Sequence, residues 1–272
     1  PIIIYGVMAQ TSITQLFAAG VIPGVFLIVV LALYSSLVAR WSKVERHSTS
    51  WKEIVATTRE AKWELFIPLM LVVGIFGGLV TLGEVASIMV AYAFVVEVFV
   101  HRDLRISQFP GIIRESMVLV GAIFIILGSA LALTTYMIDA EIPMRTLEFI
   151  QAHIHSKVAF LVALNVFLLV AGSIMEIYGA LFVIVPLIVP IAASYGIHPV
   201  HLGIIFLTNL EIGYSMPPVG LNLIISCIRF DRPVTRLYRA CLPFILIMIL
   251  ALMVITYVPW LSLWLVERFG IR

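Results

Sequence analysis

Charged residues are scarce in this sequence. Only 12% of the residues are Asp, Glu, Lys or Arg, whereas 62% are hydrophobic, and the net charge is +2. About a quarter of the residues in a typical soluble domain are charged, so this composition cannot provide a wettable surface. The small net charge gives no electrostatic basis for binding nucleic acid. The composition therefore excludes a soluble globule and indicates an integral membrane protein.

Cysteine is also rare, and the two residues present, Cys227 and Cys241, are not spaced as a metal-binding pair. Both lie in or beside apolar runs, where a free cysteine behaves as a small hydrophobic residue. Four of the histidines have poor ligand spacing and lie in predicted loops: His153, His155, His198 and His201. The apolar runs also lack a Ser-His pair, paired aspartates and a His-Glu-x-x-His motif. We therefore predict neither a transition-metal site nor an enzyme.

Long apolar runs dominate the chain. Its 272 residues would supply about six to eight membrane spans of roughly 20 residues each. The runs are too long, and alternate too little, for a β-barrel, so we predict an all-α multi-helix bundle. The chain starts inside an apolar segment, Pro1 to Ile4, without a Met or a signal-like start. We therefore expect it to be the C-terminal portion of a longer protein.

Changes in polarity along the chain predict six regions. The last of them should contain a span from Cys241 to Val266, and the first a span from Gly20 to Ala39. The regions are 1–39 (half helix, short helix and span), 40–64 (cytoplasmic amphipathic linker), 65–138 (three spanning helices), 139–157 (periplasmic amphipathic segment), 158–230 (re-entrant hairpin and broken helix) and 231–272 (short helix and last span).

The basic residues support this topology. Most of the 17 Lys and Arg residues fall on the cytoplasmic side if the loops 40–64, 101–114 and 229–239 all lie there. That arrangement requires the helical hairpin at 158–193 to enter and leave from the outer face. If the hairpin crossed the membrane, the bias would nearly vanish. The charge distribution therefore favours a re-entrant hairpin.

A weak internal repeat points to a transporter. Residues 13–21 resemble residues 234–242, and a proline follows each copy, Pro23 and Pro243. In the predicted topology the two copies run in opposite directions through the membrane. Inverted repeats with broken helices are typical of secondary transporters. The repeat thus predicts part of an inverted-repeat, ion-transporter-like fold.

Polar and helix-breaking residues interrupt two apolar segments, at 172–176 and at 209–222. Irregular backbone at membrane depth is tolerated only where it lines a protein cavity or holds a ligand or ion. Each interruption lies about 20 Å from the outer surface at 1.5 Å per residue, so we expect the two to meet. Freed carbonyls near Gly172, Gly213 and Met216 could bind a hard monovalent cation. Amides at the half-helix that starts near Pro218 could bind a carboxylate.

Six segments of the chain carry a family resemblance: Pro1 to Val7, Gly172 with Glu176, Gly196 to His201, Asn209 to Gly213, Pro217 to Asn222, and Pro259 to Leu265. With these segments the chain resembles, over its whole length, the large membrane subunit of TRAP (tripartite ATP-independent periplasmic) transporters. The resemblance implies a bacterial or archaeal inner-membrane protein for sodium-driven uptake of carboxylate-bearing solutes, such as C4-dicarboxylates or sugar acids. It also implies an elevator mechanism, a periplasmic substrate-binding protein and a small membrane subunit as partners, and no cofactor besides sodium as the coupling ion.

By this resemblance, Gly172, Gly213, Met216 and Val219 occupy positions similar to a sodium site of the family. Many members carry Thr at the position of Met216, so a ligand there must be the backbone carbonyl or Ser215. The predicted substrate or near-site residues are Ser173, Glu176, Asn209, Glu211, Ser215, Pro217, Pro218, Gly220 and Asn222.

Two of these residues have alternative interpretations. Glu211 is an acid in an apolar helix, which indicates a functional group or else a partner for a polar group on a neighbouring helix. Glu176 could equally stabilise the N-terminus of the helix that follows it. For the whole chain, the alternatives are a sodium- or proton-coupled anion transporter that needs no binding protein, an ion channel, and a non-transporting structural membrane subunit.

Overall fold

The computed structural model describes residues 1–41, 50–77, 79–175, 177–217, 220–230 and 233–270, and it is helical, with no strand in these ranges. The predicted all-α membrane fold is thereby confirmed. Within the described part, six stretches are long and apolar enough to cross a membrane: 13–41, 83–101, 106–129, 157–174, 177–194 and 234–257. The sequence forms helices because its apolar runs must satisfy their backbone hydrogen bonds internally.

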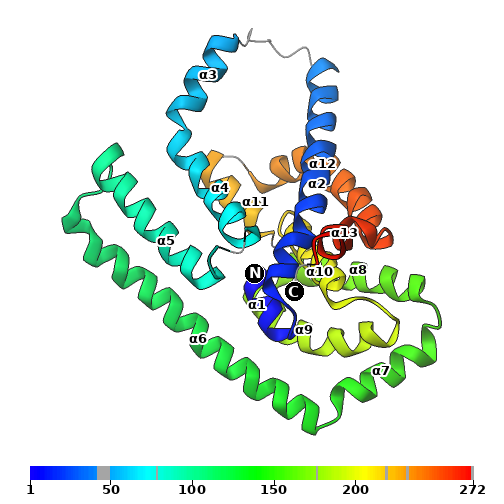
Figure 1. The fold of residues 1–272 in the computed structure, drawn as a ribbon. Coiled ribbons are helices and arrows are strands. Elements are labelled where there is room, and N and C mark those ends of the chain that lie inside the picture. The colour runs from blue at the N-terminus through cyan, green and yellow to red at the C-terminus, as the bar shows by residue number, and fades with distance from the viewer. Residues whose placement is uncertain (42–49, 78, 176, 218–219, 231–232, 271–272) are drawn as a thin grey trace. The chain divides into compact units, whose positions relative to one another are not determined.

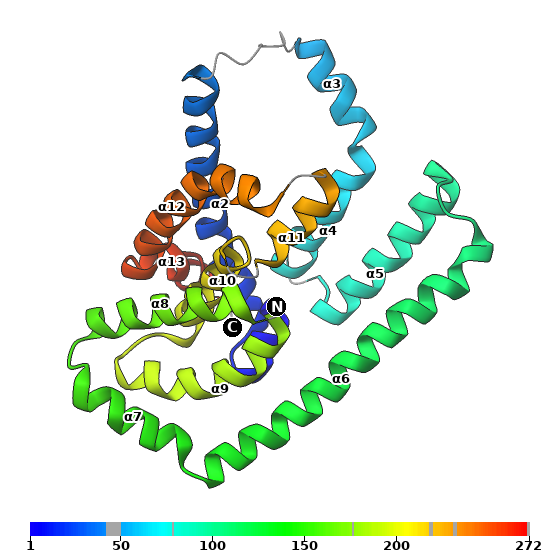
Figure 2. The same ribbon diagram turned by 180° about the vertical axis from the view of Figure 1, so that it is seen from behind.

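The chain divides into two compact units, Pro1–Ser42 with Leu127–Arg272, and Lys43–Ile126. The first unit holds the two interruptions (Figure 1, with the reverse view in Figure 2). Its helices are α1 (Ile2–Met8), α2 (Ile13–Trp41), the end of α6 (Phe109–Asp139), α7 (Ile142–His153), α8 (Lys157–Ile174), α9 (Ile177–Ser194), α10 (Pro199–Gly213), α11 (Leu221–Phe230), α12 (Val234–Tyr257) and α13 (Trp260–Phe269).

The second unit contains α3 (Trp51–Glu60), α4 (Lys62–Phe76), α5 (Leu82–Val95) and the first part of α6, with a π-helical turn at Val96–His101 and a 3-10 turn at Ile106–Gln108. Thr81 and Glu84 form a capping box that starts α5, so two of the amides at this helix end are satisfied. The Tyr92 hydroxyl donates to the Trp63 carbonyl oxygen at 3.0 Å, which ties α5 to α4.

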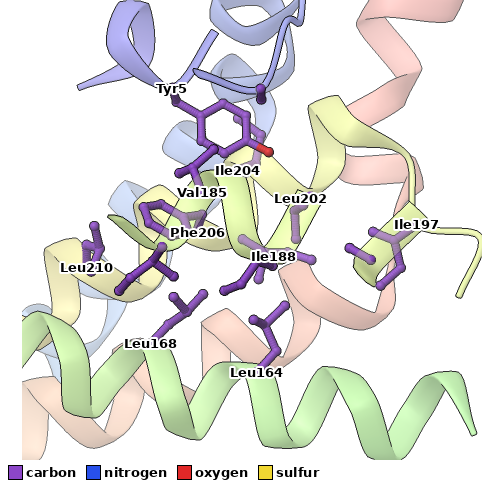
Figure 3. Close-up of a cluster of buried hydrophobic side chains, with 14 of the residues drawn as sticks. Tyr5, Leu164, Leu168, Val185, Ile188, Ile197, Leu202, Ile204, Phe206 and Leu210 are labelled. Carbon is purple, nitrogen blue, oxygen red and sulfur yellow. The ribbon is translucent and has the colours of Figure 1, made fainter. Parts of the chain in front are cut away.

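The core of the first unit forms where α1, α2, α8, α9 and α10 meet (Figure 3). The rings of Tyr5 and Phe206 lie 5.9 Å apart, and the Tyr5 hydroxyl donates to the Pro199 carbonyl oxygen at 3.0 Å. A Cβ atom on Gly203 would lie 2.6 Å from the Tyr5 ring, so only glycine fits beneath it. Because lipid tails are as apolar as these side chains, close packing rather than water exclusion stabilises this core.

Three predicted boundaries are wrong. The helix α2 is continuous from Ile13, with no break at Gly20, and α12 likewise runs unbroken through Cys241. The last predicted span ends at Tyr257 instead of Val266, and a separate helix, α13, follows. Pro259 explains this ending, because its ring disfavours the helical conformation in the residue before it.

Candidate functional site

The helices α8 and α10 touch at two glycines. A Cβ atom on Gly213 would lie 2.8 Å from both the Cα and the carbonyl carbon of Gly172, and a Cβ on Gly172 would lie 3.1 Å from the Leu210 Cα. Small residues let two helix backbones approach this closely. One contact pair is Asn165 with Asn209, and a second, further along both helices, is Gly172 with Gly213. The two helices therefore run in the same direction, and their C-terminal ends meet.

Both helices end at this contact. The α8 helix ends at Ile174, where the Met175 amide donates to the Ala171 carbonyl oxygen at 2.7 Å. The α10 helix ends at Gly213, whose carbonyl oxygen accepts from the Met216 amide at 2.9 Å. The last carbonyls of a helix have no partner within that helix and carry its negative partial charge. Where the ends of α8 and α10 meet, the last carbonyl oxygens of both helices are therefore brought together.

The described residues that follow α10 and those that begin α11 lie close together, and this region is called the turn below. Gly220 has a φ of +46°, and a Cβ atom there would lie 2.6 Å from the Met216 carbonyl oxygen. Glycine is therefore needed both for the left-handed backbone and for the close approach. The Asn222 amide donates to the Tyr214 carbonyl oxygen at 3.2 Å, and the Leu223 amide donates to the Gly220 oxygen at 2.8 Å. The turn thus uses two of the amides at the start of α11.

The structure separates the other predicted site residues by exposure. Ser173 and Gly220 are buried, and the Ser173 hydroxyl donates to the Val170 carbonyl oxygen at 2.8 Å. Ser215 and Met216 are half-buried, whereas Glu211, Pro217 and Asn222 are exposed in this chain. The predictions for Glu176, Pro218 and Val219 lie outside the described residues.

Asn209 and Glu211 lie on different sides of α10. The Asn209 side chain is fully buried, and its amide nitrogen donates to the Asn165 Oδ1 at 2.7 Å and to the Ile205 carbonyl oxygen at 2.8 Å. Glu211 is exposed. It lies two residues after Asn209, about 200° around the helix, and so faces away from the buried side on which Asn209 lies. Sequence reasoning placed both near one site, because it had no information about the helix's orientation.

Two residues bonded to this region were missed by the sequence reasoning. Asn165 and Thr256 are both buried and bond to each other, with the Asn165 amide nitrogen 3.2 Å from the Thr256 hydroxyl oxygen. The sequence could have pointed to Asn165, since a lone amide side chain in an apolar run is unusual. Nothing in the sequence distinguishes Thr256. His201, predicted in a loop, instead lies buried in α10 with its Nε2 3.2 Å from the Thr256 carbonyl oxygen.

The long apolar helices define a multi-pass α-helical membrane protein in which two helix ends meet inside the fold. Residues 1–261 match the family model described as "Tripartite ATP-independent periplasmic transporter, DctM component". The chain belongs to this family, and the resemblance seen in its motifs is confirmed. It is a multi-pass inner-membrane protein.

Curated relatives agree with this assignment. The chain is 34% identical to a C4-dicarboxylate TRAP transporter large permease protein from Pseudomonas aeruginosa, over 98% of the chain and 63% of the relative. It is 33% identical to an isethionate TRAP transporter permease protein from Oleidesulfovibrio alaskensis, over 95% of the chain and 41% of that protein. A sialic acid TRAP transporter large permease protein from Vibrio cholerae is 28% identical over 99% of the chain. The chain thus spans less than two thirds of the length of the first two relatives.

Proposed function

We propose that this chain is the part of a secondary transporter that binds the coupling ion during sodium-driven uptake of carboxylate-bearing organic acids, of the C4-dicarboxylate or sugar-acid type. The observation that carries the proposal is the backbone contact between Gly172 and Gly213, where the ends of α8 and α10 meet. A channel or a purely structural subunit would not need two helix ends packed against each other at buried glycines. Transporters use such ends to bind ions.

The sodium ion is assigned to the backbone oxygens of Gly172, Gly213, Met216 and Val219, of which Val219 lies outside the described residues. Carbonyl oxygens are hard ligands, which suit a hard cation, and the C-terminal ends of both helices favour positive charge. Met216 would contribute its carbonyl oxygen and not its thioether, because a Cβ atom on Gly220 would lie 2.6 Å from that oxygen, which therefore faces the backbone of the turn. In this proposal the ion needs no side-chain hydroxyl at position 216.

The substrate carboxylate is assigned to side chains around the turn and not to the first amides of α11. The amides of Asn222 and Leu223 already donate to Tyr214 and Gly220 within the turn. The half-buried Ser215 and the exposed Asn222 carry side-chain donors at the same place. This changes the sequence expectation, in which backbone amides would hold the carboxylate. Ser173, Gly220 and Pro217 would then shape the site without supplying its main donors.

The proposed topology makes α8 and α9 a re-entrant hairpin. The α10 helix has 15 residues, about 22 Å, and so falls short of a hydrocarbon core of about 30 Å. Because the end of α8 touches the end of α10, the hairpin tip would lie at the same depth as the break. An inverted repeat is supported by α2 and α12, since each begins with its copy of the repeat and contains Pro23 or Pro243 within one long helix.

The proposed partners are a small membrane subunit of the same transporter and a periplasmic binding protein that delivers the solute. The description "tripartite" of the family supports a three-component system. In this proposal the hairpin and the broken helix move together as the mobile part of an elevator. The solute would be carried with the ion, and no ATP would be consumed.

Cysteine labelling tests the topology. After both native cysteines, Cys227 and Cys241, are replaced by serine, single cysteines at Ser50 and at His155 should react with impermeant maleimide from opposite sides of the membrane, because the three spans predicted at 65–138 separate them. Labelling would be measured in sealed spheroplasts and in inverted vesicles. Labelling of both positions from one side would contradict the topology predicted for the part of the chain before the hairpin.

Reconstituted uptake tests the function itself. The complete permease, with its small subunit and binding protein, should accumulate a C4-dicarboxylate or sugar acid in liposomes when an inward sodium gradient is imposed. Isethionate would be included, because a relative is named for it. Uptake should stop when potassium replaces sodium and should not change when ATP is added. Accumulation driven by a proton gradient alone, or without the binding protein, would refute the proposal.

A further inference from the structure

Three buried polar side chains join α8, α10 and α12. Asn165 is 1% exposed, Asn209 is 0% exposed and Thr256 is 1% exposed. The Asn209 amide nitrogen donates to the Asn165 Oδ1 at 2.7 Å, and the Asn165 amide nitrogen lies 3.2 Å from the Thr256 hydroxyl oxygen. Side chains of one residue per helix thus form a continuous hydrogen-bonded chain, called the polar chain below.

The apolar contacts around the polar chain do not by themselves fix how far one helix slides along another. The neighbouring buried residues are mostly Leu and Ile, such as Leu164, Leu168 and Ile205, and similar aliphatic side chains can replace one another in a core at small cost. Buried amides are different, because a slide that breaks their hydrogen bonds leaves donors and acceptors unpaired in an apolar interior. The polar chain therefore selects one register among several that these aliphatic contacts would allow.

That register also sets the glycine contact. Along α10, Gly213 lies one turn beyond Asn209, and along α8, Gly172 lies two turns beyond Asn165. A slide of one residue moves a helix by about 1.5 Å and turns its face by about 100°. Such a slide of α8 would bring a side chain into the place of Gly172, where a Cβ atom would lie 3.1 Å from the Leu210 Cα. The hydrogen bonds and the glycine contact hence require the same register.

Asn209 is itself held by its neighbours. Its amide nitrogen has two acceptors, the Asn165 Oδ1 and the Ile205 carbonyl oxygen, which fix the orientation of its side chain. Its Oδ1 is buried without a hydrogen-bond partner among the described residues. The predicted role of Asn209 as a substrate or near-site residue and a role in positioning make different predictions for Thr256, which bonds to Asn165.

We propose that Asn165, Asn209 and Thr256 are positioning residues: they fix α8 against α10 and α12, and so hold the carbonyls of Gly172 and Gly213 at the spacing that sodium requires. This inference rests on the sodium site proposed above and adds α12 as its support. Without the polar chain the helices still pack through their aliphatic side chains, but they shift against one another more easily, and the close contact between Gly172 and Gly213 is lost in the shifted arrangements. The cation site then exists for only part of the time, and sodium binds more weakly.

Thr256 provides the sharpest test, because Thr256→Val removes the hydroxyl while keeping the shape, and Thr256→Ser restores the hydroxyl. Both keep the backbone carbonyl that faces His201. In the complete permease with its partners, Thr256→Val should raise the sodium concentration for half-maximal uptake about tenfold, equivalent to about 1.4 kcal/mol. Thr256→Ser should stay near the wild-type value. The maximal rate at saturating sodium should fall much less than the sodium affinity.

A role in stability alone would reduce the amount of folded protein and the maximal rate, with the sodium concentration for half-maximal uptake unchanged, and that result would overturn the proposal. If uptake by the wild-type protein does not depend on sodium, the proposed function fails. The claim that the polar chain fixes the helix register is then tested by distances between spin labels alone. Spin labels at the exposed Val166 on α8 and Leu246 on α12 should give a broader distance distribution in Thr256→Val than in Thr256→Ser. Equal distributions would refute the register claim.

Discussion

Replacing Gly213 with alanine is expected to abolish sodium-driven uptake. The added methyl group would lie 2.8 Å from the Gly172 backbone, and backbone atoms cannot rotate away as a side chain can. The helix ends of α8 and α10 must then separate, which costs about 1–3 kcal/mol of packing energy. The carbonyl groups proposed to bind sodium separate with them. Uptake and thermal unfolding of the purified complex would both be measured.

Gly24→Ala on α2 is the matched control, since a Cβ atom at Gly24 meets no atom within 4 Å. Alanine is also the better helix former by up to about 1 kcal/mol, so this variant should keep its uptake and unfold at the same or a slightly higher temperature. Normal uptake by Gly213→Ala, with no change in the apparent sodium affinity, would show that the glycine contact is not part of the transport site.

Phe206→Ala is expected to be the most destabilising substitution in the core. Phe206 is 1% exposed, and its ring lies 5.9 Å from that of Tyr5. In a bilayer the transfer of apolar surface to lipid costs little, so the loss comes from the cavity and amounts to about 2–3 kcal/mol. In a protein of this size that corresponds to a drop in melting temperature of about 5–10 °C. Fluorescence-detected size exclusion after heating would measure it.

Phe149→Ala on α7 removes the same side chain from an exposed position. Phe149 is 67% exposed, and its ring contacts that of His153, one turn away on the same helix. Its loss should cost less than about 1 kcal/mol, as surface substitutions usually do. An equal drop in melting temperature for both variants would mean that the cluster around Phe206 does not limit the stability of the complex.

The contact between the two interruptions could be anticipated from the sequence, because its signals are local. Gly172, Gly213 and the two adjacent prolines interrupt apolar runs, and such interruptions in a membrane helix point to a binding site regardless of the surrounding fold. The distance of each interruption from the start of its helix also placed both at a similar depth. The contact between Gly172 and Gly213 agrees with this prediction of a similar depth.

The directions of side chains around α10 could not be anticipated. Asn209 and Glu211 read as one polar pair, yet Asn209 bonds to Asn165 in the interior while Glu211 is exposed in this chain. Hydrophobic periodicity normally reveals which face of a helix is buried, but a helix that is apolar on every face carries no such signal. Thr256 was missed for a related reason, since a single hydroxyl in an apolar run can bond within its own helix.

The sequence by itself determined that this chain is a helical membrane protein, where its helices are interrupted, and which family it resembles, because bilayer thickness and backbone hydrogen bonding act on each segment separately. Only the tertiary structure decided that α2 and α12 are continuous and that Asn165, Asn209 and Thr256 meet. The bond between Asn165 and Thr256 joins segments that lie 91 residues apart in the chain. Packing between helices, and not the preference of any one segment, selects them.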